Sequence, residues 1–241
     1  MKNLVFVGSV VAALAGAALA GQVDVAFAPF QTGSGGEFQV IKVVGGGYPG
    51  KTGLFADVAS NSFQSFCIEY TEHINVGRYS FTIDAGAING GAGGGNPDPV
   101  SPATAWLYSN FRNGTLPTIA YNFGGPQSFT YVYGAGRQAS ASIVQSALWM
   151  MEDEPDANGQ TGQNAAARDA IIAYAQAATA NTTSTFGVRA LNLFTDNNNN
   201  GVYDNGDTPN QSFLTIIPLP TGSGLALAGL GGLAIRRRRT A

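Results

Sequence analysis

The sequence predicts an α+β fold, a mainly antiparallel β-sheet structure with an inserted helical segment. Stretches with period-2 alternation of apolar residues dominate the first third of the chain, and helix-forming stretches follow in the middle. Stretches rich in β-branched and aromatic residues return near the end. Strands on both sides of a block of helices are typical of α+β proteins, so we expect one domain with an insertion.

The expected strands are bounded by Gly- and Pro-rich breaks. They are residues 23–28, 37–44, 62–70 and 79–83 in the first third, and residues 186–194 and 213–217 near the end. The expected helices are residues 103–111, 137–151 and 164–178, the last of which is rich in Ala and follows the Asn158-Gly159 turn. Residues 86–102 are Gly- and Pro-rich without an apolar period, so they are expected to form a loop.

The N-terminus has the pattern of a signal peptide. Lys2 precedes an apolar run over residues 4–19, and Ala18-Leu19-Ala20 is the small-x-small pattern that signal peptidase cleaves. We therefore expect residues 1–20 to be removed after Ala20, which leaves residues 21–217 as the mature extracellular domain.

The C-terminus, residues 218–241, carries a second targeting pattern. Pro218-Leu219-Pro220-Thr221 precedes an apolar run and then Arg236, Arg237, Arg238 and Arg239. The run is shorter than the ~20 residues of a membrane-spanning helix, and the arginines would hold its end on the cytoplasmic side. The pattern resembles the PEP-CTERM sorting signals that an exosortase-type membrane protease reads, with Leu219 where that family usually has Glu.

The resemblance implies processing near Pro218 and Pro220, a transient C-terminal membrane anchor, and a secreted or cell-surface location. An ordinary tail anchor is the alternative.

The charge of the mature domain excludes some classes of partner. All fifteen acidic residues lie between the two terminal segments, whereas these segments hold five of the twelve basic residues. Such an acidic domain is not expected to bind nucleic acid or anionic lipid through backbone electrostatics.

The sequence lacks the usual catalytic patterns. His73 is the only histidine, and neither a Gly-x-Ser-x-Gly elbow nor a His-Glu-x-x-His helix is present. His73 is expected to be a solvated surface residue. The acidic cluster Glu152, Asp153, Glu154 and Asp156 is expected to be a solvated helix end. We therefore do not expect an enzyme.

Cys67 is the only cysteine of a chain that carries export signals. A disulfide within the chain would need a second cysteine, and a free thiol is a liability in an oxidising compartment. Three explanations remain open: an inert buried thiol, a disulfide to another molecule, or a thiol committed to another bond.

Two short motifs favour a committed thiol. Phe66-Cys67-Ile68-Glu69 lies in an expected strand, and Val144-Gln145-Ser146-Ala147-Leu148-Trp149 lies in an expected helix. Together they resemble the two halves of the thioester domains of bacterial surface adhesins. The resemblance implies an internal thioester between Cys67 and Gln145, which an amine or hydroxyl group of a partner protein or polysaccharide would open. In the alternative, Cys67 is a small buried side chain and Gln145 bonds to the backbone.

A second motif has the spacing of a calcium-binding loop. Counted from Asp196, oxygen donors fall at positions 1, 3, 5, 7, 9 and 12, and a glycine stands at position 6. The expected Ca²⁺ ligands are Asp196, Asn198, Asn200, the Val202 carbonyl, Asp204 and Asp207. The flanking residues are expected strands, so the loop resembles an isolated extracellular calcium loop. An Asn/Gly-rich hairpin without metal is the alternative.

Two functions remain after these exclusions. The first is an exported cell-surface or extracellular-matrix protein that attaches covalently to a partner through the Cys67–Gln145 thioester. The alternative is a non-reactive structural protein of the exopolysaccharide matrix or envelope.

Overall fold

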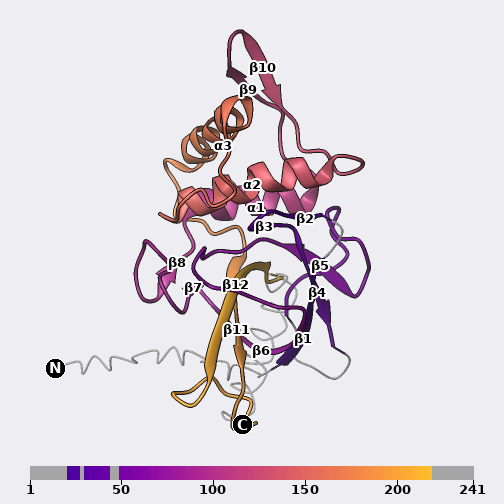
Figure 1. Ribbon diagram of the computed structural model, residues 1–241, viewed down its shortest axis with the longest axis vertical. Coiled ribbons are helices and arrows are strands. Elements are labelled where there is room, and N and C mark those ends of the chain that lie inside the picture. The colour runs from indigo at the N-terminus through magenta and orange to yellow at the C-terminus, as the bar shows by residue number, and fades with distance from the viewer. Residues whose placement is uncertain (1–20, 28–29, 44–48, 219–241) are drawn as a thin grey trace, which may run out of the picture.

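Six antiparallel strands form the main sheet of the computed structural model, which describes residues 21–27, 30–43 and 49–218 (Figure 1). The order across the sheet is β12-β11-β6-β1-β4-β5. The strands are β1 Gly21–Ala26, β4 Phe38–Lys42, β5 Ser62–Ser65, β6 Gly77–Asp84, β11 Val188–Thr195 and β12 Thr208–Ile216. The expected α+β fold with a mainly antiparallel sheet is confirmed.

The sheet curls until the chain beyond β5 meets β12. Ile68 N–H donates to the Ser212 carbonyl at 2.9 Å, and Leu214 N–H donates to the Phe66 carbonyl at 3.2 Å. Between these two bonds Cys67 is directly opposite Phe213 in an isolated antiparallel bridge. The two edges of the sheet are therefore joined at one end, and Cys67 lies at this seam.

Side chains alternate between two cores at the seam, as they do along any strand. Cys67 faces the interior of the curled sheet, while Phe66 and Ile68 face the helices. The interior of the sheet is filled by apolar side chains from all six strands and from one helix: Val23, Val25, Phe38, Val40, Phe63, Phe81, Trp149, Leu191, Leu193 and Phe213.

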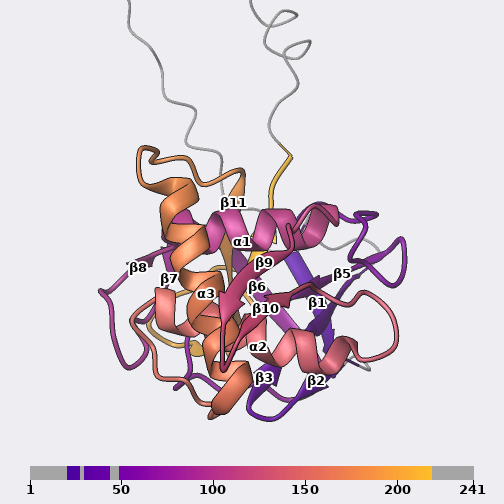
Figure 2. The ribbon, with the colours of Figure 1, turned by 90° about the horizontal axis from the view of Figure 1, so that it is seen from above.

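The helical segment is inserted between β6 and β11, which are neighbours in the sheet. It contains α1 Pro102–Asn113, α2 Arg137–Met151 and α3 Gly162–Thr179. The helices cover one end of the curled sheet, with α1 and α2 next to the sheet and α3 above them (Figures 1 and 2). The apolar faces of α1 and α2 pack on Phe66 and Ile68, so the inserted segment completes the second core.

Capping residues set the ends of α1. The Ser101 hydroxyl accepts the N–H of Thr104 at 3.2 Å, and Pro102 takes a first-turn position, where its missing N–H costs nothing. Gly114 ends the helix with φ of 69°, a conformation that favours glycine.

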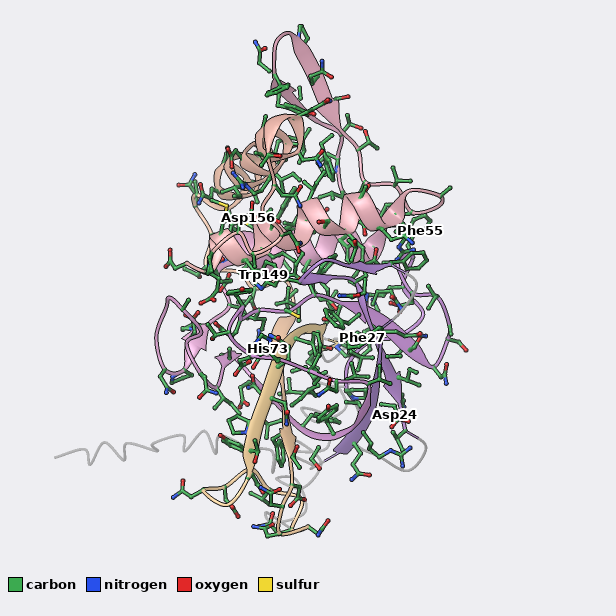
Figure 3. The ribbon with its side chains drawn as sticks, in the orientation of Figure 1. Asp24, Phe27, Phe55, His73, Trp149 and Asp156 are labelled. Atoms are coloured by element: carbon green, nitrogen blue, oxygen red, sulfur yellow. The ribbon has the colours of Figure 1, made fainter. Side chains whose placement is uncertain are left out.

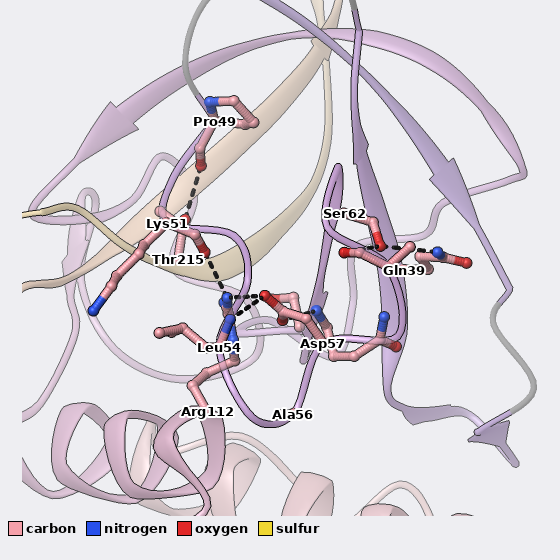
Figure 4. A network of polar contacts seen from close by, with 12 residues as sticks. Gln39, Pro49, Lys51, Leu54, Ala56, Asp57, Ser62, Arg112 and Thr215 are labelled. Carbon is pink, nitrogen blue, oxygen red and sulfur yellow. Dashed lines mark hydrogen bonds and ion pairs between the residues drawn. The ribbon is translucent and has the colours of Figure 1, made fainter.

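A buried ion pair attaches α1 to the loop that precedes β5 (Figure 4). Arg112 donates to Asp57 at 3.0 Å and to the carbonyl of Lys51 at 2.5 Å. Asp57 also accepts the N–H groups of Leu54 and Gln64, both at 3.1 Å. Arg112 and Asp57 thus neutralise each other and also pair with backbone groups of this loop and of β5.

Several expected boundaries were wrong. The strand expected at residues 62–70 ends at Ser65 because the next residues cross to β12, and β12 begins at Thr208 rather than 213. Three small hairpins were missed: β2 Gln31–Thr32 with β3 Gly35–Gly36, β7 Gly86–Ala87 with β8 Asp98–Pro99, and β9 Ile119–Asn122 with β10 Pro126–Phe129. Strands of two to four residues are too short to show a period.

The targeting patterns fall almost wholly outside the described residues. Ala20, Pro220 and Arg236 to Arg239 lie there, while Pro218 is the last described residue. Within the described part, no helix has the length and apolar character needed to cross a membrane.

Candidate functional site

The structure brings Cys67 and Gln145 together beneath α2. Gln145 lies in the middle of α2, on the face turned toward the curled sheet, and Cys67 lies at the seam below it. The exposed fraction is 2% for Cys67 and 0% for Gln145, so both residues are shielded from bulk water.

The side-chain amide of Gln145 bonds to the backbone of Cys67 at both ends. Gln145 Nε2 donates to the Cys67 carbonyl oxygen at 2.9 Å, and Gln145 Oε1 accepts the Cys67 N–H at 3.0 Å. In the seam, the neighbours Phe66 and Ile68 bond to β12, so the polar groups of Cys67 point the other way. Gln145 occupies the place of the missing neighbouring strand.

A second N–H group reaches the same oxygen. Gly36 N–H donates to Gln145 Oε1 at 3.4 Å, from the last residue of β3. Two backbone N–H groups aimed at one carbonyl oxygen withdraw electron density from its carbon, as an oxyanion hole does. The Gln145 carbonyl carbon is therefore held in an environment that favours attack by a nucleophile. One of the two N–H donors is that of Cys67, the residue that also carries the thiol.

The thiol of Cys67 is protonated. Burial is the main cause that raises its pKa well above the ordinary value, and the nearby charge of Glu72 adds to the rise. A protonated, buried thiol does not react readily with external reagents. Reaction of Cys67 with a reagent in solution is therefore expected to be slow while the fold stays closed.

Aromatic residues enclose the pair from the side of the sheet. Trp149, one helical turn after Gln145, is 1% exposed and lies between α2 and the sheet (Figure 3). Its ring meets Tyr70 edge to face with 5.6 Å between the centroids. Gln145, Leu148 and Trp149 are all buried, so this part of α2 is shielded from solvent.

The β2–β3 hairpin closes the site from the outer side of α2 (Figure 2). A β-carbon on Gly35 would lie 2.7 Å from Gln145 Cγ and 2.6 Å from the Trp149 ring. Such distances leave no space for a side chain, so the hairpin backbone rests directly on the two helix residues. Gly35 and Gly36 are buried, whereas Gly33 and Ser34 at the tip are exposed.

The solvated helix end expected at residues 152–156 is wrong for its two glutamates, which are each 4% exposed. Glu154 Oε1 accepts the N–H groups of Ala92 and Gly93 at 2.5 and 2.8 Å, and its Oε2 accepts that of Tyr70 at 3.0 Å. Glu152 accepts the N–H of Ser101 at 3.1 Å. The Gly-rich loop thus supplies donors that the sequence pattern did not reveal.

Glu69 faces Glu154 across this loop. A β-carbon on Gly91 would overlap Oε2 of Glu69 and Oε1 of Glu154, so only glycine fits between the two carboxyl groups. Both carboxyl oxygens of Glu69 are buried without a hydrogen-bond partner among the described residues. Burial raises the pKa of Glu69 to about 9, and the charges of Glu154, Asp98, Glu72 and Glu152 contribute in that order. Glu69 is therefore neutral at pH 7.

The expected calcium loop is the exposed turn between β11 and β12. Its side chains bond to the loop itself: Asp196 accepts the N–H groups of Asn200 and Gly201, and Asp207 accepts those of Asn197 and Asp204. Asp204 accepts from the Gly206 N–H at 2.8 Å and from the side-chain amides of Asn200 and Asn198 at 2.8 and 3.0 Å. The Gly206 bond is the main cause that lowers the pKa of Asp204, and the two amide bonds add to it.

A Ca²⁺ ion would therefore need these two amides to turn their oxygens inward. In the ranges 21–27, 30–43 and 49–218, no three His, Cys, Asp or Glu side chains lie close enough to hold one metal ion. His73 is exposed, as expected.

Comparison with known proteins gives no relative from which a function could be inferred. No family model matches the chain, and neither a curated protein nor a solved structure matches it.

The sequence motifs named Cys67 and Gln145, which are in contact in the structure, but not the groups around them. Gly36 contributes through its backbone, which no side-chain motif encodes. The Gly-Ser-Gly-Gly stretch over residues 33–36 was the available signal, because such a run favours a tight turn. Glu69 is the last residue of the Phe66-Cys67-Ile68-Glu69 motif, but only its position opposite Glu154 shows its unusual state.

Proposed function

We propose that the protein is an exported cell-surface or extracellular-matrix protein that holds an internal Cys67–Gln145 thioester and uses it to attach covalently to a partner. The observation that carries this proposal is the contact between the two residues. The Gln145 side-chain amide bonds to the backbone of the chain's only cysteine, and its oxygen accepts two N–H groups.

The chemistry is balanced without any further reagent. The Cys67 sulfur attacks the Gln145 carbonyl carbon, and the N–H groups of Cys67 and Gly36 stabilise the oxyanion that forms. The carbon–nitrogen bond breaks, the thiol proton leaves with the amide nitrogen, and ammonia departs. Exclusion of water then protects the thioester from hydrolysis, consistent with the burial of both residues.

A partner molecule opens the thioester. An amine or hydroxyl group attacks the acyl carbon of residue 145, an amide or ester forms, and the Cys67 thiol is released with the proton. Suitable groups are lysine amines of a surface protein and hydroxyls of a polysaccharide. The chain itself turns over no substrate, so we class it as a non-enzymatic attachment protein.

Export would place the site where such partners occur. We propose that signal peptidase acts after Ala20 and that an exosortase-type protease acts near Pro218 and Pro220, while Arg236 to Arg239 hold the transient anchor. Replacing the four arginines with neutral residues should reduce membrane retention before processing. Recovery of the apolar C-terminal run, residues 222–235, in the mature surface protein would instead support a plain tail anchor.

Incorporation of methylamine tests the reactive bond. The purified protein should take up one methylamine, peptide mapping should locate it at residue 145, and one thiol should become titratable. Cys67→Ala and Gln145→Ala should both abolish uptake. Gln211→Ala is the matched control, because Gln211 is buried and bonds to the backbone of Glu69 rather than Cys67. Absence of uptake in the native protein would favour a non-reactive structural protein of the exopolysaccharide matrix or envelope.

A further inference from the structure

The β2–β3 hairpin is attached to the rest of the fold at two places of unequal strength. At its base, Glu37 forms a buried ion pair with Arg137, the first residue of α2, with two bonds of 2.6 Å. The Tyr131 hydroxyl donates to the same carboxylate. This attachment is charged, shielded from water and made by several bonds.

The tip of the hairpin depends on one neighbouring turn. Ser34 N–H donates to Asn158 Oδ1 at 3.1 Å, and the Ser34 hydroxyl donates to the Ala157 carbonyl at 3.4 Å. These bonds are neutral and exposed, so they are weaker than the charged bonds at the base. The hairpin would therefore separate at its tip before it separates at its base.

Asn158 connects this tip to the helix that carries Gln145. While Oδ1 accepts from Ser34, Nδ2 donates to the Ser142 carbonyl in α2 at 3.1 Å. Ser142 lies three residues before Gln145, on the adjacent turn of the helix. One half-buried side chain thus holds the hairpin and the helix together next to the reactive pair.

We infer that Asn158 is a positioning residue that keeps the β2–β3 hairpin over the acyl carbon of residue 145 and so selects nucleophiles by size. The inference rests on the proposed thioester. A small amine reaches the carbon past the hairpin, whereas a larger amine needs the tip to move away. In both cases the amine nitrogen bonds to the carbon, the carbon–sulfur bond breaks and Cys67 takes the proton.

The test compares two amines in each variant. The ratio of the opening rate with a lysine-containing peptide to the rate with methylamine removes any change that affects both amines equally. Asn158→Ala should raise this ratio about fivefold, the size expected from the loss of one neutral hydrogen bond. Asn158→Asp keeps the oxygen that accepts from Ser34, so its ratio should lie closer to that of the native protein.

Asn122→Ala is the matched control. Asn122 accepts the Gly125 N–H at 3.2 Å in the turn of the distant β9–β10 hairpin, so its loss should leave the ratio unchanged. A merely structural role of Asn158 would alter stability but not the discrimination between amines. An unchanged ratio in Asn158→Ala would overturn the inference.

A second readout separates this inference from the proposed function. If the native protein carries a free thiol instead of a thioester, alkylation of Cys67 by iodoacetamide under native conditions still reports access to the site. Faster alkylation in Asn158→Ala than in the native protein and in Asn122→Ala would support the hairpin as a cover. Equal rates in all three proteins would overturn it.

Discussion

Gln145 and Cys67 are joined by a reciprocal pair of hydrogen bonds, with Nε2 donating to the Cys67 carbonyl at 2.9 Å and Oε1 accepting the Cys67 N–H at 3.0 Å. The side chain of a helix residue thus takes the place of a strand beside the only cysteine. This contact satisfies the backbone of the seam and also holds a polarised carbonyl carbon in a dry site. The first role concerns stability and the second concerns the reactive bond, so a conservative replacement of Gln145 can separate them.

Gln145→Glu should remove the reactive bond while leaving the fold intact. A carboxylate has no amide nitrogen to release as ammonia, so no thioester should form, and Cys67 should be titratable after unfolding. Loss of the Nε2 donor leaves the Cys67 carbonyl unpaired, which should lower the free energy of unfolding by about 1–3 kcal/mol relative to the protein with an unreacted Gln145 amide. Denaturant unfolding and thiol titration measure the two effects. A thiol that stays blocked in this variant would show that another residue is its partner.

The base of the β2–β3 hairpin should contribute strongly to stability. Arg137→Met leaves the Glu37 carboxylate buried without its cation, which is expected to cost about 3–5 kcal/mol in urea unfolding. Asp24→Asn is the matched control, because it removes the exposed Asp24–Arg78 pair and should cost less than about 1 kcal/mol. Similar losses in the two variants would contradict the importance of the buried pair.

The neutral state of Glu69 predicts a loss of stability at high pH. Its pKa rises from 4.5 to about 9 on folding, so the folded state favours the proton. The stabilisation is complete below pH 4.5 and is lost progressively as the pH rises toward 9. Glu69→Gln has a side chain of nearly the same shape and carries no charge at any pH, so it has no proton to lose as the pH rises.

Glu69→Gln should therefore be more stable than the native protein at pH 8, by on the order of 1–3 kcal/mol, with a smaller difference at pH 5. Thermal unfolding from pH 5 to 9 measures the difference. Asp153→Asn, at the exposed neighbouring position, should follow the native profile. A Glu69→Gln profile parallel to that of the native protein would mean that Glu69 does not hold the proton.

The loop between β11 and β12 should bind Ca²⁺ weakly, if its amides turn toward the ion. We expect a dissociation constant of about 10⁻⁴–10⁻³ M, the range of extracellular modules, and a higher melting temperature in millimolar Ca²⁺. Asp196→Ala should abolish both effects, and Asp169→Ala on α3 should change neither. Calorimetry that detects no binding would leave a polar hairpin held by its own Asn and Asp side chains.

The sequence predicted the parts of the fold that follow from periodicity. The strands around Val23 and Val40 and helix α2 lie where alternation and helix signals placed them, because each pattern repeats over several residues. The two-residue strands at Gln31 and Gly35 have no such repeat, so the element that covers the site was missed.

The sequence also predicted only part of the candidate site. Cys67 and Gln145 were identified from motifs, and their contact depends on the seam between the chain after β5 and β12, a pairing across more than half of the chain. Glu152 and Glu154 were placed in solvent because local sequence does not show that the distant Gly-rich loop returns to donate its N–H groups. In both cases the contact is made by residues far apart in the sequence, which a local pattern does not show.

The intact mass of the mature protein tests the thioester most directly. Fresh protein, purified without exposure to amines, should weigh less than its sequence mass by one ammonia, and Cys67→Ala and Gln145→Ala should each show their full sequence mass. Treatment with methylamine should add one methylamine to the native protein and to neither variant. A native mass equal to the sequence value would contradict the thioester and leave a structural matrix protein as the better account.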